Sequence, residues 1–263
     1  MIDWRDFMKI FIDAGHNFSG FNAGAVGNGM REQDITFDVS LKLAKILEAA
    51  GLTTRLSRPT LETNLGTDNT SAINARWQLA NFWGADIFIS IHANAGGGTG
   101  VEVIYGKDDS AQLARVVQRV YSQAMGLRDR RVWRRDDIGV VRHTKAPAIL
   151  VELAFIDSPP SNPDVDILRN KRDDMAAALA AGLFEYLGIE PAKKEAAESE
   201  PTEKEPPRRY KQLDELPNWA RPSIEKLVKQ GYLKGDGDDL DLSMDMVRIF
   251  VVHDMAGLYD RGQ

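Results

Sequence analysis

Short apolar segments alternate with longer segments of helical periodicity through residues 1–190 of the chain. A short apolar run bounded by turn-forming residues is typical of a buried strand, whereas apolar residues three or four positions apart indicate an amphipathic helix. The alternation predicts an α/β fold, with a central, mostly parallel, twisted sheet and helices on both faces. The expected strands are 9–13, 53–57, 86–91, 100–105 and 148–151, and the expected helices are 34–50, 71–83, 110–125 and one that ends near Leu187.

The clearest helical segment begins close to Asp34, an acidic residue of the kind that caps helix N-termini. Its apolar residues include Ile35 and Val39 at helical spacing, and Gly51 follows its expected end. We therefore expect Asp34 to be the N-cap, with Glu32 in the loop before the helix.

A sharp change in composition falls at residues 191–209, which contain four prolines and ten charged residues but no aromatic side chain. Such a segment buries too little apolar surface to offset the entropy that it loses on ordering. Aromatic and apolar residues return after it. We predict a first domain at 1–190, a linker at 191–209 and a small separate C-terminal domain at 210–263.

Composition excludes several kinds of site. The chain of 263 residues has no cysteine, so histidine and carboxylate side chains remain as the expected metal ligands. Its net charge of -6 argues against nucleic acid as a partner, because non-specific binding to phosphates needs a basic surface. Apolar runs are too short to span a membrane, so we expect no membrane insertion.

Two of the four histidines follow predicted strands. His16 comes shortly after the first strand and His92 directly after the strand 86–91, while Glu152 follows the strand 148–151 in the same way. The C-terminal ends of parallel strands lie at one edge of the sheet, where ligands commonly bind. We expect these side chains to meet there, with Glu32 close by, because a glycine-rich stretch allows the chain to fold back over His16.

Two imidazoles and one carboxylate are the ligand set of a catalytic zinc ion that keeps one position open for water. A second carboxylate is then free to take a proton from that water and pass it to a leaving amine, which suits amide hydrolysis. The spacing of these residues does not decide which carboxylate has which role. It also leaves open that the histidines are ordinary polar residues at the sheet edge.

Four motifs occur in a fixed order along the chain: KIFIDAGH at 9–16, GAVGNG at 24–29 followed by Glu32, SIHAN at 90–94 and LVELAF at 150–155. Together they resemble the zinc-dependent N-acetylmuramoyl-L-alanine amidases of the type 3 family, over about residues 8–188. The resemblance implies that His16, Glu32 and His92 bind Zn2+ and that Glu152 is the catalytic carboxylate. The implied reaction, typical of endolysins and autolysins, is hydrolysis of the amide between N-acetylmuramic acid and L-alanine in peptidoglycan.

Three positions depart from the family pattern. Ala14 stands where proline is common, Ala154 stands where glycine is usual, and the loop at 17–22 is longer than usual. These positions shape loops, so they bear on substrate preference more than on zinc. Two alternatives stay open: a non-catalytic protein that binds muropeptides or wall polymer, and a zinc peptidase that cleaves within the stem peptide.

Four further residues are candidate substrate contacts. Arg131 and Trp133 belong to an arginine-rich segment, where guanidinium groups can hold stem-peptide carboxylates and the indole can pack against a sugar. Asn94 follows His92 and can orient substrate, and His143 can reach the same groove. The alternatives are ordinary roles as solvated charge, turn residue or surface histidine.

The C-terminal residues 210–263 loosely resemble a single S-layer-homology-like repeat, in the segments 218–227, 229–236 and 245–248. The resemblance implies a small domain that binds a secondary wall polymer or mediates dimerisation, so a monomer or a dimer is expected. Peptidoglycan is the main expected partner. Residues 1–9 lack the apolar core and cleavage site of a signal peptide, so we expect synthesis in the cytoplasm and release to the wall through a holin or by lysis.

Overall fold

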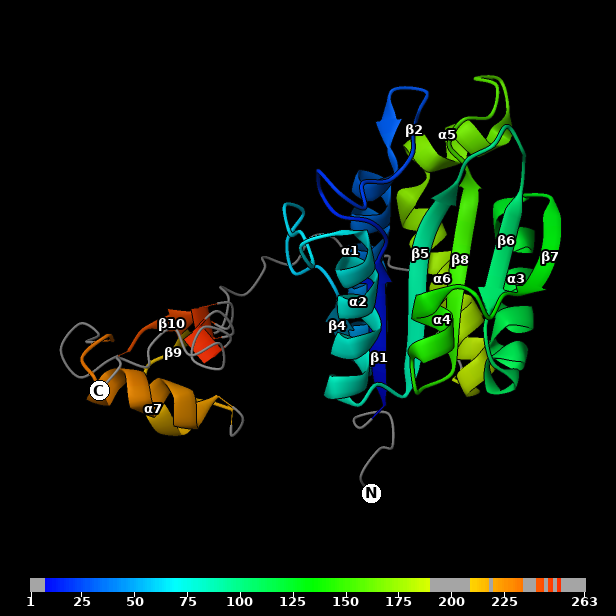
Figure 1. Cartoon of the computed structure of the whole chain (residues 1–263). Coiled ribbons are helices and arrows are strands. Elements are labelled where there is room, and N and C mark those ends of the chain that lie inside the picture. The colour runs from blue at the N-terminus through cyan, green and yellow to red at the C-terminus, as the bar shows by residue number, and fades with distance from the viewer. Residues whose placement is uncertain are drawn as a thin grey trace, which may run out of the picture. The chain divides into compact units, whose positions relative to one another are not determined.

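The computed structural model describes residues 8–189, 209–217, 220–233, 240–243, 246–247 and 250–251. The chain divides into two compact units, Met1–Lys193 and Lys194–Gln263, and each unit is described by itself (Figure 1). The predicted linker at 191–209 lies outside the described residues, except for Arg209.

A six-stranded sheet forms the centre of the first unit. Its strands are β1 (Lys9–Ala14), β4 (Thr53–Leu56), β5 (Ile87–Asn94), β6 (Val101–Tyr105), β7 (Asp129–Arg134) and β8 (Ala148–Phe155). They are arranged in the order β4-β1-β5-β8-β6-β7. The β6–β8 pair is antiparallel and the other neighbouring pairs are parallel, which confirms the prediction of a mostly parallel sheet.

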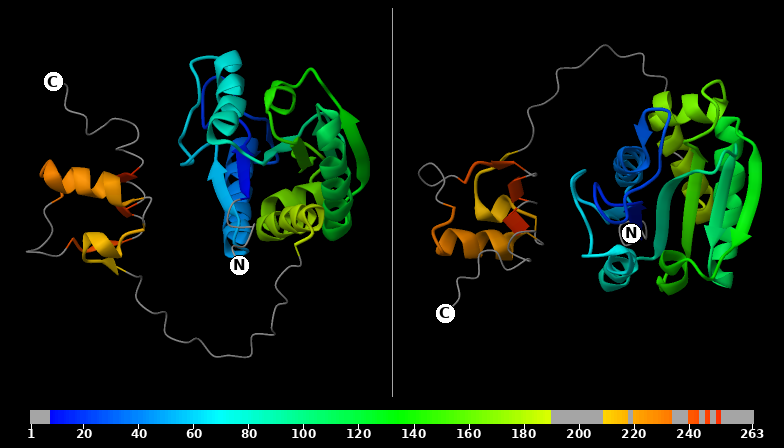
Figure 2. Two further views of the ribbon diagram at one scale, coloured as in Figure 1. Left: turned by 90° about the horizontal axis from the view of Figure 1, so that it is seen from below. Right: turned by 45° about the horizontal axis from the view of Figure 1, so that its top comes forward.

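Helices cover both faces of this sheet (Figures 1 and 2). One face packs against α1 (Glu32–Ala49), α3 (Ala111–Met125) and α6 (Arg172–Leu187), and the opposite face carries α2 (Asn69–Trp83) and α4 (Gly139–His143). Successive strand residues point to opposite faces, so each strand contributes to both apolar clusters. On β5, Ile89 belongs to the larger cluster under α1, α3 and α6, whereas Phe88 belongs to the cluster under α2 and α4.

Helix α1 begins earlier than the sequence suggests. Its first residue is Glu32, and Asp34 lies in its first turn, so the prediction of Asp34 as N-cap is wrong. A hairpin of β2 (Val26–Gly27) and β3 (Met30–Arg31) leads directly into the helix. The N–H of Glu32 donates to the Ala25 carbonyl at 2.9 Å, which fixes the helix start next to this hairpin.

Three strands also differ from expectation. β5 and β8 continue through the polar residues expected to follow them, so His92 and Glu152 are strand residues. β7 was not expected, because its sequence is mostly charged. It is an edge strand, where charged side chains can extend into solvent. A further helix, α5 (Pro163–Asn170), follows β8 and begins with proline behind an Asn162 cap.

The second unit has an apolar cluster of its own. β9 (Arg209–Tyr210) pairs antiparallel with β10 (Leu242–Ser243), and α7 (Arg221–Lys229) follows the short 3-10 helix η3 (Leu213–Glu215). Ile224 of α7 packs in this cluster with residues of both strands. Across the described part of the whole chain, no helix combines the length and hydropathy that crossing a membrane requires.

Candidate active site

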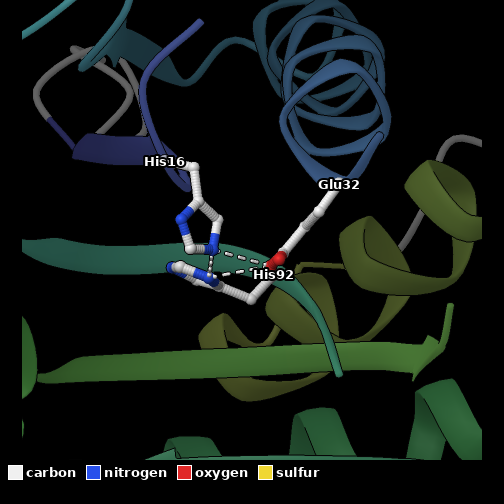
Figure 3. A group of neighbouring side chains, drawn as sticks. All are labelled: His16, Glu32 and His92. Carbon is white, nitrogen blue, oxygen red and sulfur yellow. Dashed lines mark hydrogen bonds and ion pairs between the residues drawn. The ribbon is translucent and has the colours of Figure 1, made fainter. Parts of the chain in front are cut away.

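Three polar side chains from separate elements converge near the C-terminal ends of β1 and β5 (Figure 3). His16 follows β1, Glu32 begins α1 and His92 lies on β5. The Nε2 atom of His16 lies 2.9 Å from Oε1 of Glu32. The Nδ1 atom of His92 lies 3.1 Å from both of these atoms. One ion can therefore contact all three side chains.

The main chain fixes the carboxylate of Glu32. The N–H of Ala25 donates to Oε2 and the N–H of Ala93 donates to Oε1, both at 2.9 Å. Gly24 provides the necessary space, because a Cβ atom there would lie 2.8 Å from Cβ of Glu32 and 2.9 Å from Oε2. The carboxylate is thus held toward the two imidazoles.

A buried arginine on α2 holds the turn that carries His16. His16 has a φ of 65°, in the left-handed region that residues other than glycine rarely adopt. The guanidinium of Arg76 donates to the carbonyl of His16 at 2.6 Å and to the carbonyl of Ala14 at 2.7 Å. It also pairs with the carboxylate of Asp13 at 2.6 Å. Arg76 therefore positions His16 through the backbone.

The Asp13–Arg76 pair is buried. Burial raises the pKa of Asp13, but the charge of Arg76 and a hydrogen bond from Ser90 outweigh it and bring the pKa below its usual value. The sequence motifs did not identify Arg76, although the pattern of α2 could have done so. The buried residues of α2 are spaced four apart along one face of the helix: Ala72, Arg76 and Ala80. A charged residue on such a buried face indicates a buried partner of opposite charge.

Arg76→Met is expected to destabilise the first unit by about 3–5 kcal/mol, because it leaves the buried carboxylate of Asp13 without its partner. Urea unfolding followed by circular dichroism measures the loss. The double variant Asp13→Asn/Arg76→Met removes both charges and should be more stable than Arg76→Met alone; the reverse order would contradict the assignment.

The stability of the first unit should also depend on pH through Asp13, because the pKa of its carboxyl group is lowered on folding. The stabilisation from ionised Asp13 is present above the pKa of the unfolded state, about 3.9, and is lost as the pH falls through the pKa of the folded state.

The three converging side chains fit a metal ion. Burial raises the pKa of Glu32, but the hydrogen bonds and charges of His16 and His92 lower it by more. The net pKa lies below its usual value, so the carboxylate form is favoured. Burial lowers the pKa of His92, which favours the neutral imidazole that metals bind. Their ligand atoms lie within 4.8 Å of one another. Two imidazoles and one carboxylate are the donor set of catalytic zinc sites.

Glu152 lies beside this group. Its Cα is in register with that of His92 on the neighbouring strand. Burial raises the pKa of Glu152 to about 8, and the negative charges of Glu32 and Glu102 add to the effect. Its Oε2 atom is buried and has no hydrogen-bond partner among the described residues. Such a carboxyl group is suited to taking up and releasing a proton near neutral pH.

His92, Glu152 and Glu102 form a row of polar residues across three neighbouring strands. Glu102 lies on β6 and is in register with Glu152. Its carboxylate accepts hydrogen bonds from Nε of Arg130 at 2.6 Å and from Nδ2 of Asn94 at 3.1 Å. Asn94 therefore lies close to the row, with its amide bonded inside the protein. Glu102 was not predicted, although a single acidic residue in the otherwise apolar strand Val101–Tyr105 could have indicated it. Arg130 belongs to the arginine-rich segment that was expected to hold stem-peptide carboxylates, but its guanidinium pairs with Glu102.

A cavity of about 330 Å³ opens beside the proposed metal ligands. Its lining includes His16 and His92, together with Ile73 of α2 and Val140 of α4. Apolar and polar groups thus meet next to the ligand atoms, as in sites that bind small molecules.

The four predicted substrate contacts lie outside the lining of this cavity. Asn94 is bonded to Glu102, as described above. Arg131 and Trp133 lie on the edge strand β7, around a separate hollow. His143 ends α4, and its ring centroid lies 5.4 Å from that of Trp77. The structure therefore brings the proposed metal ligands and Glu152 together. Asn94 lies next to them through its bond to Glu102, whereas Arg131 and Trp133 share a separate hollow and His143 lies on α4.

Known proteins resemble this chain over its first unit. The family model for N-acetylmuramoyl-L-alanine amidase matches residues 10–185. The sporulation-specific N-acetylmuramoyl-L-alanine amidase of Bacillus subtilis strain 168 is 38% identical over 156 residues, which cover 57% of this chain and 57% of that protein. The endolysin of Bacillus phage SPP1 is 31% identical over 210 residues, which cover 75% of this chain and 72% of that protein.

A solved structure has the same fold. The N-acetylmuramoyl-L-alanine amidase from Clostridium difficile 630 superposes with a TM-score of 0.59 and 29% identity, over 69% of this chain and 97% of that one. The chain spans slightly more than half the length of the first two curated relatives, 57% and 58%. The family match contains all three converging side chains and Glu152. The chain therefore belongs to the N-acetylmuramoyl-L-alanine amidase family.

Proposed function

We propose that this chain is a zinc-dependent enzyme that hydrolyses the amide bond between N-acetylmuramic acid and L-alanine in peptidoglycan. The convergence of His16, Glu32 and His92 in a chain of this family carries the proposal. The position of Glu152 beside His92 supports it, because the reaction needs a group that transfers protons. The name of the family and of the similar proteins supports the choice of substrate.

In this proposal His16, Glu32 and His92 hold the zinc ion through Nε2, Oε1 and Nδ1. Zinc in such a site polarises a carbonyl group and lowers the pKa of water. Glu152 takes a proton from the attacking water on its carboxylate and passes it to the nitrogen of the leaving L-alanine. Arg76 keeps His16 in place through the hydrogen bond to its carbonyl.

Mass spectrometry of digested peptidoglycan tests this proposal. The expected products are glycan with a free lactyl group and intact stem peptides with a free N-terminal L-alanine. Stems that are shortened internally would instead indicate a zinc peptidase. Binding without any product would indicate a non-catalytic wall protein. A protein treated with a chelator and then reloaded with zinc is the matched control, and we expect product formation only after reloading.

We also propose that the second unit binds a secondary polymer of the cell wall. The separate apolar cluster and the loose likeness to an S-layer-homology-like repeat support this function. Parts of the three segments that carry the likeness lie outside the described residues, among them 218–219, 234–236 and 245.

A chain that ends at Lys193 is expected to cleave small soluble muropeptides as well as the full chain does, because all proposed ligands and Glu152 lie in the first unit. On intact walls the shortened chain should be slower, since a tethered wall-binding unit raises the effective concentration of enzyme at its substrate. Parallel assays on soluble fragments and on whole walls measure both effects. Loss of turnover on soluble fragments would show that the second unit is part of the active-site scaffold.

A further inference from the structure

The edge strand β7 borders a hollow of about 320 Å³ that is separate from the cavity at the metal ligands. Its lining consists of Arg128, Asp129, Arg130, Arg131 and Trp133, and we call it the β7 hollow. We propose that the β7 hollow binds carboxylate groups of the peptide part of the substrate. This inference rests on the proposed amidase function and adds a site for the stem peptide.

The topology of the sheet places the β7 hollow at the same end as the active site. β6 and β7 run opposite to β8 (Figure 1). Asp129, the first residue of β7, pairs with Val101, and the next residue of β6, Glu102, is in register with Glu152, so the beginning of β7 lies at the level of Glu152. β7 is two strands away from β8, which corresponds to roughly 10 Å. An extended peptide advances about 3.3 Å per residue. A stem peptide that leaves the reacting amide beside Glu152 therefore reaches β7 within about three residues.

Two guanidinium groups are available in this hollow. Arg130 is engaged by Glu102, and Arg134 further along β7 is paired with Asp108. Arg128 and Arg131 are exposed, and the described residues provide neither of them with a carboxylate partner. Their positive charges are free to pair with anionic groups of a ligand.

Among the described residues, the carboxylate of Asp129 forms no ion pair with Arg128 or Arg131. Its Oδ1 atom accepts hydrogen bonds from Nε2 of Gln118 and from the backbone N–H of Arg131, each at 2.7 Å. The carboxylate is thus used to fix the local backbone. That backbone is unusual, since Arg131 has a φ of 80° at a shift in the register between β6 and β7. Irregularities of this kind redirect side chains at sheet edges.

Trp133 adds an apolar surface on the side of the active site. It is in register with Ile104, which packs with Leu150 on the face covered by α2 and α4. Glu152 lies two residues after Leu150 and shares that face, because alternate strand residues point the same way. Trp133 is 50% exposed, so its ring can contact a peptide that crosses from Glu152 toward β7.

These features fit an acidic peptide. Guanidinium groups form paired, charge-assisted hydrogen bonds with carboxylates, and an exposed indole packs against the peptide backbone. The ligand that we infer is the stem peptide itself, bound through carboxylates that lie two or three residues beyond the cleaved amide.

The test compares two soluble muropeptides that differ only in whether the stem carboxylates beyond L-alanine are free or amidated. In the full chain, Arg128→Gln/Arg131→Gln is expected to lower kcat/KM for the free acid by about three- to tenfold, since each exposed ion pair contributes modestly. The loss should fall on KM, with kcat preserved, because the contact is equally present before and during the reaction. Turnover of the amidated muropeptide should not change.

Arg134→Gln is the matched control, because it removes one arginine from the same strand outside the lining of the hollow. It should retain the wild-type ratio of activities on the two muropeptides. Equal losses on both muropeptides, or no loss in the double variant, would overturn the inference. If the wild-type protein releases peptide from neither muropeptide, the proposed function itself is wrong. Cleavage of both by the wild-type protein, with the same ratio in the double variant, overturns only the carboxylate site.

Discussion

Glu152→Gln is expected to reduce the turnover of a soluble muropeptide by at least about 10²-fold, the lower end of what a positioned general base contributes. The substitution preserves the size of the side chain and its place on β8, but the amide cannot take up a proton. Glu152 is not among the three residues whose ligand atoms converge, so bound zinc should stay at the wild-type level. Steady-state kinetics and metal analysis of the same preparation measure the two effects.

Two further glutamate variants serve as controls for this result. Glu185→Gln changes a glutamate on the surface of α6 that pairs with Arg119, and it should leave turnover unchanged. Glu32→Gln changes the carboxylate that faces both imidazoles, and it should lose zinc. If Glu152→Gln instead lost the metal while Glu32→Gln retained it, the two carboxylates would have exchanged roles.

His16→Ala and His92→Ala each remove a direct ligand of the zinc ion. Loss of a residue that only hydrogen-bonds to a metal ligand typically weakens metal binding by about 10- to 100-fold, so we expect each of these variants to weaken zinc binding by more than that. Hydrolysis should fall in parallel. Competition with a chelating dye measures the affinity, and added zinc should restore activity only in part.

His143→Ala is the matched control for these variants, because His143 lies on α4 outside the group of converging ligand atoms. It should bind zinc as the wild-type protein does. Unchanged affinity in both His16→Ala and His92→Ala would show that the metal ligands are misassigned.

The sequence predicts the fold class well because the strands of this sheet are short apolar runs that local periodicity identifies. It also places His16, His92 and Glu152 at one sheet edge, since each comes late in or just after a parallel strand. It misjudges where the strands end. The apolar runs stop before His92 and Glu152, but pairing between β5 and β8 continues through both residues.

The contacts of Glu102 with Glu152 and Arg130 depend on the order of the strands in the sheet, which local sequence patterns do not determine. Glu102 meets Glu152 because β6 lies beside β8, and Arg130 meets Glu102 because β7 lies beside β6. The sequence predicted Arg131 as a substrate contact within a charged segment, but could not show that its neighbour Arg130 forms an ion pair with Glu102. Arg76 could not be tied to His16 without the packing of α2 against the sheet.

The place of β8 in the sheet has a consequence for how the chain folds. β8 lies between β5 and β6, yet it follows both in the sequence. Until Ala148–Phe155 is available, the strands can form only two separate pieces, β4-β1-β5 and β6-β7. His16, Glu32 and His92 are therefore synthesised before the strand that joins these pieces. Pairing between strands distant in sequence slows folding, so we expect insertion of β8 to be the late step that completes the first unit.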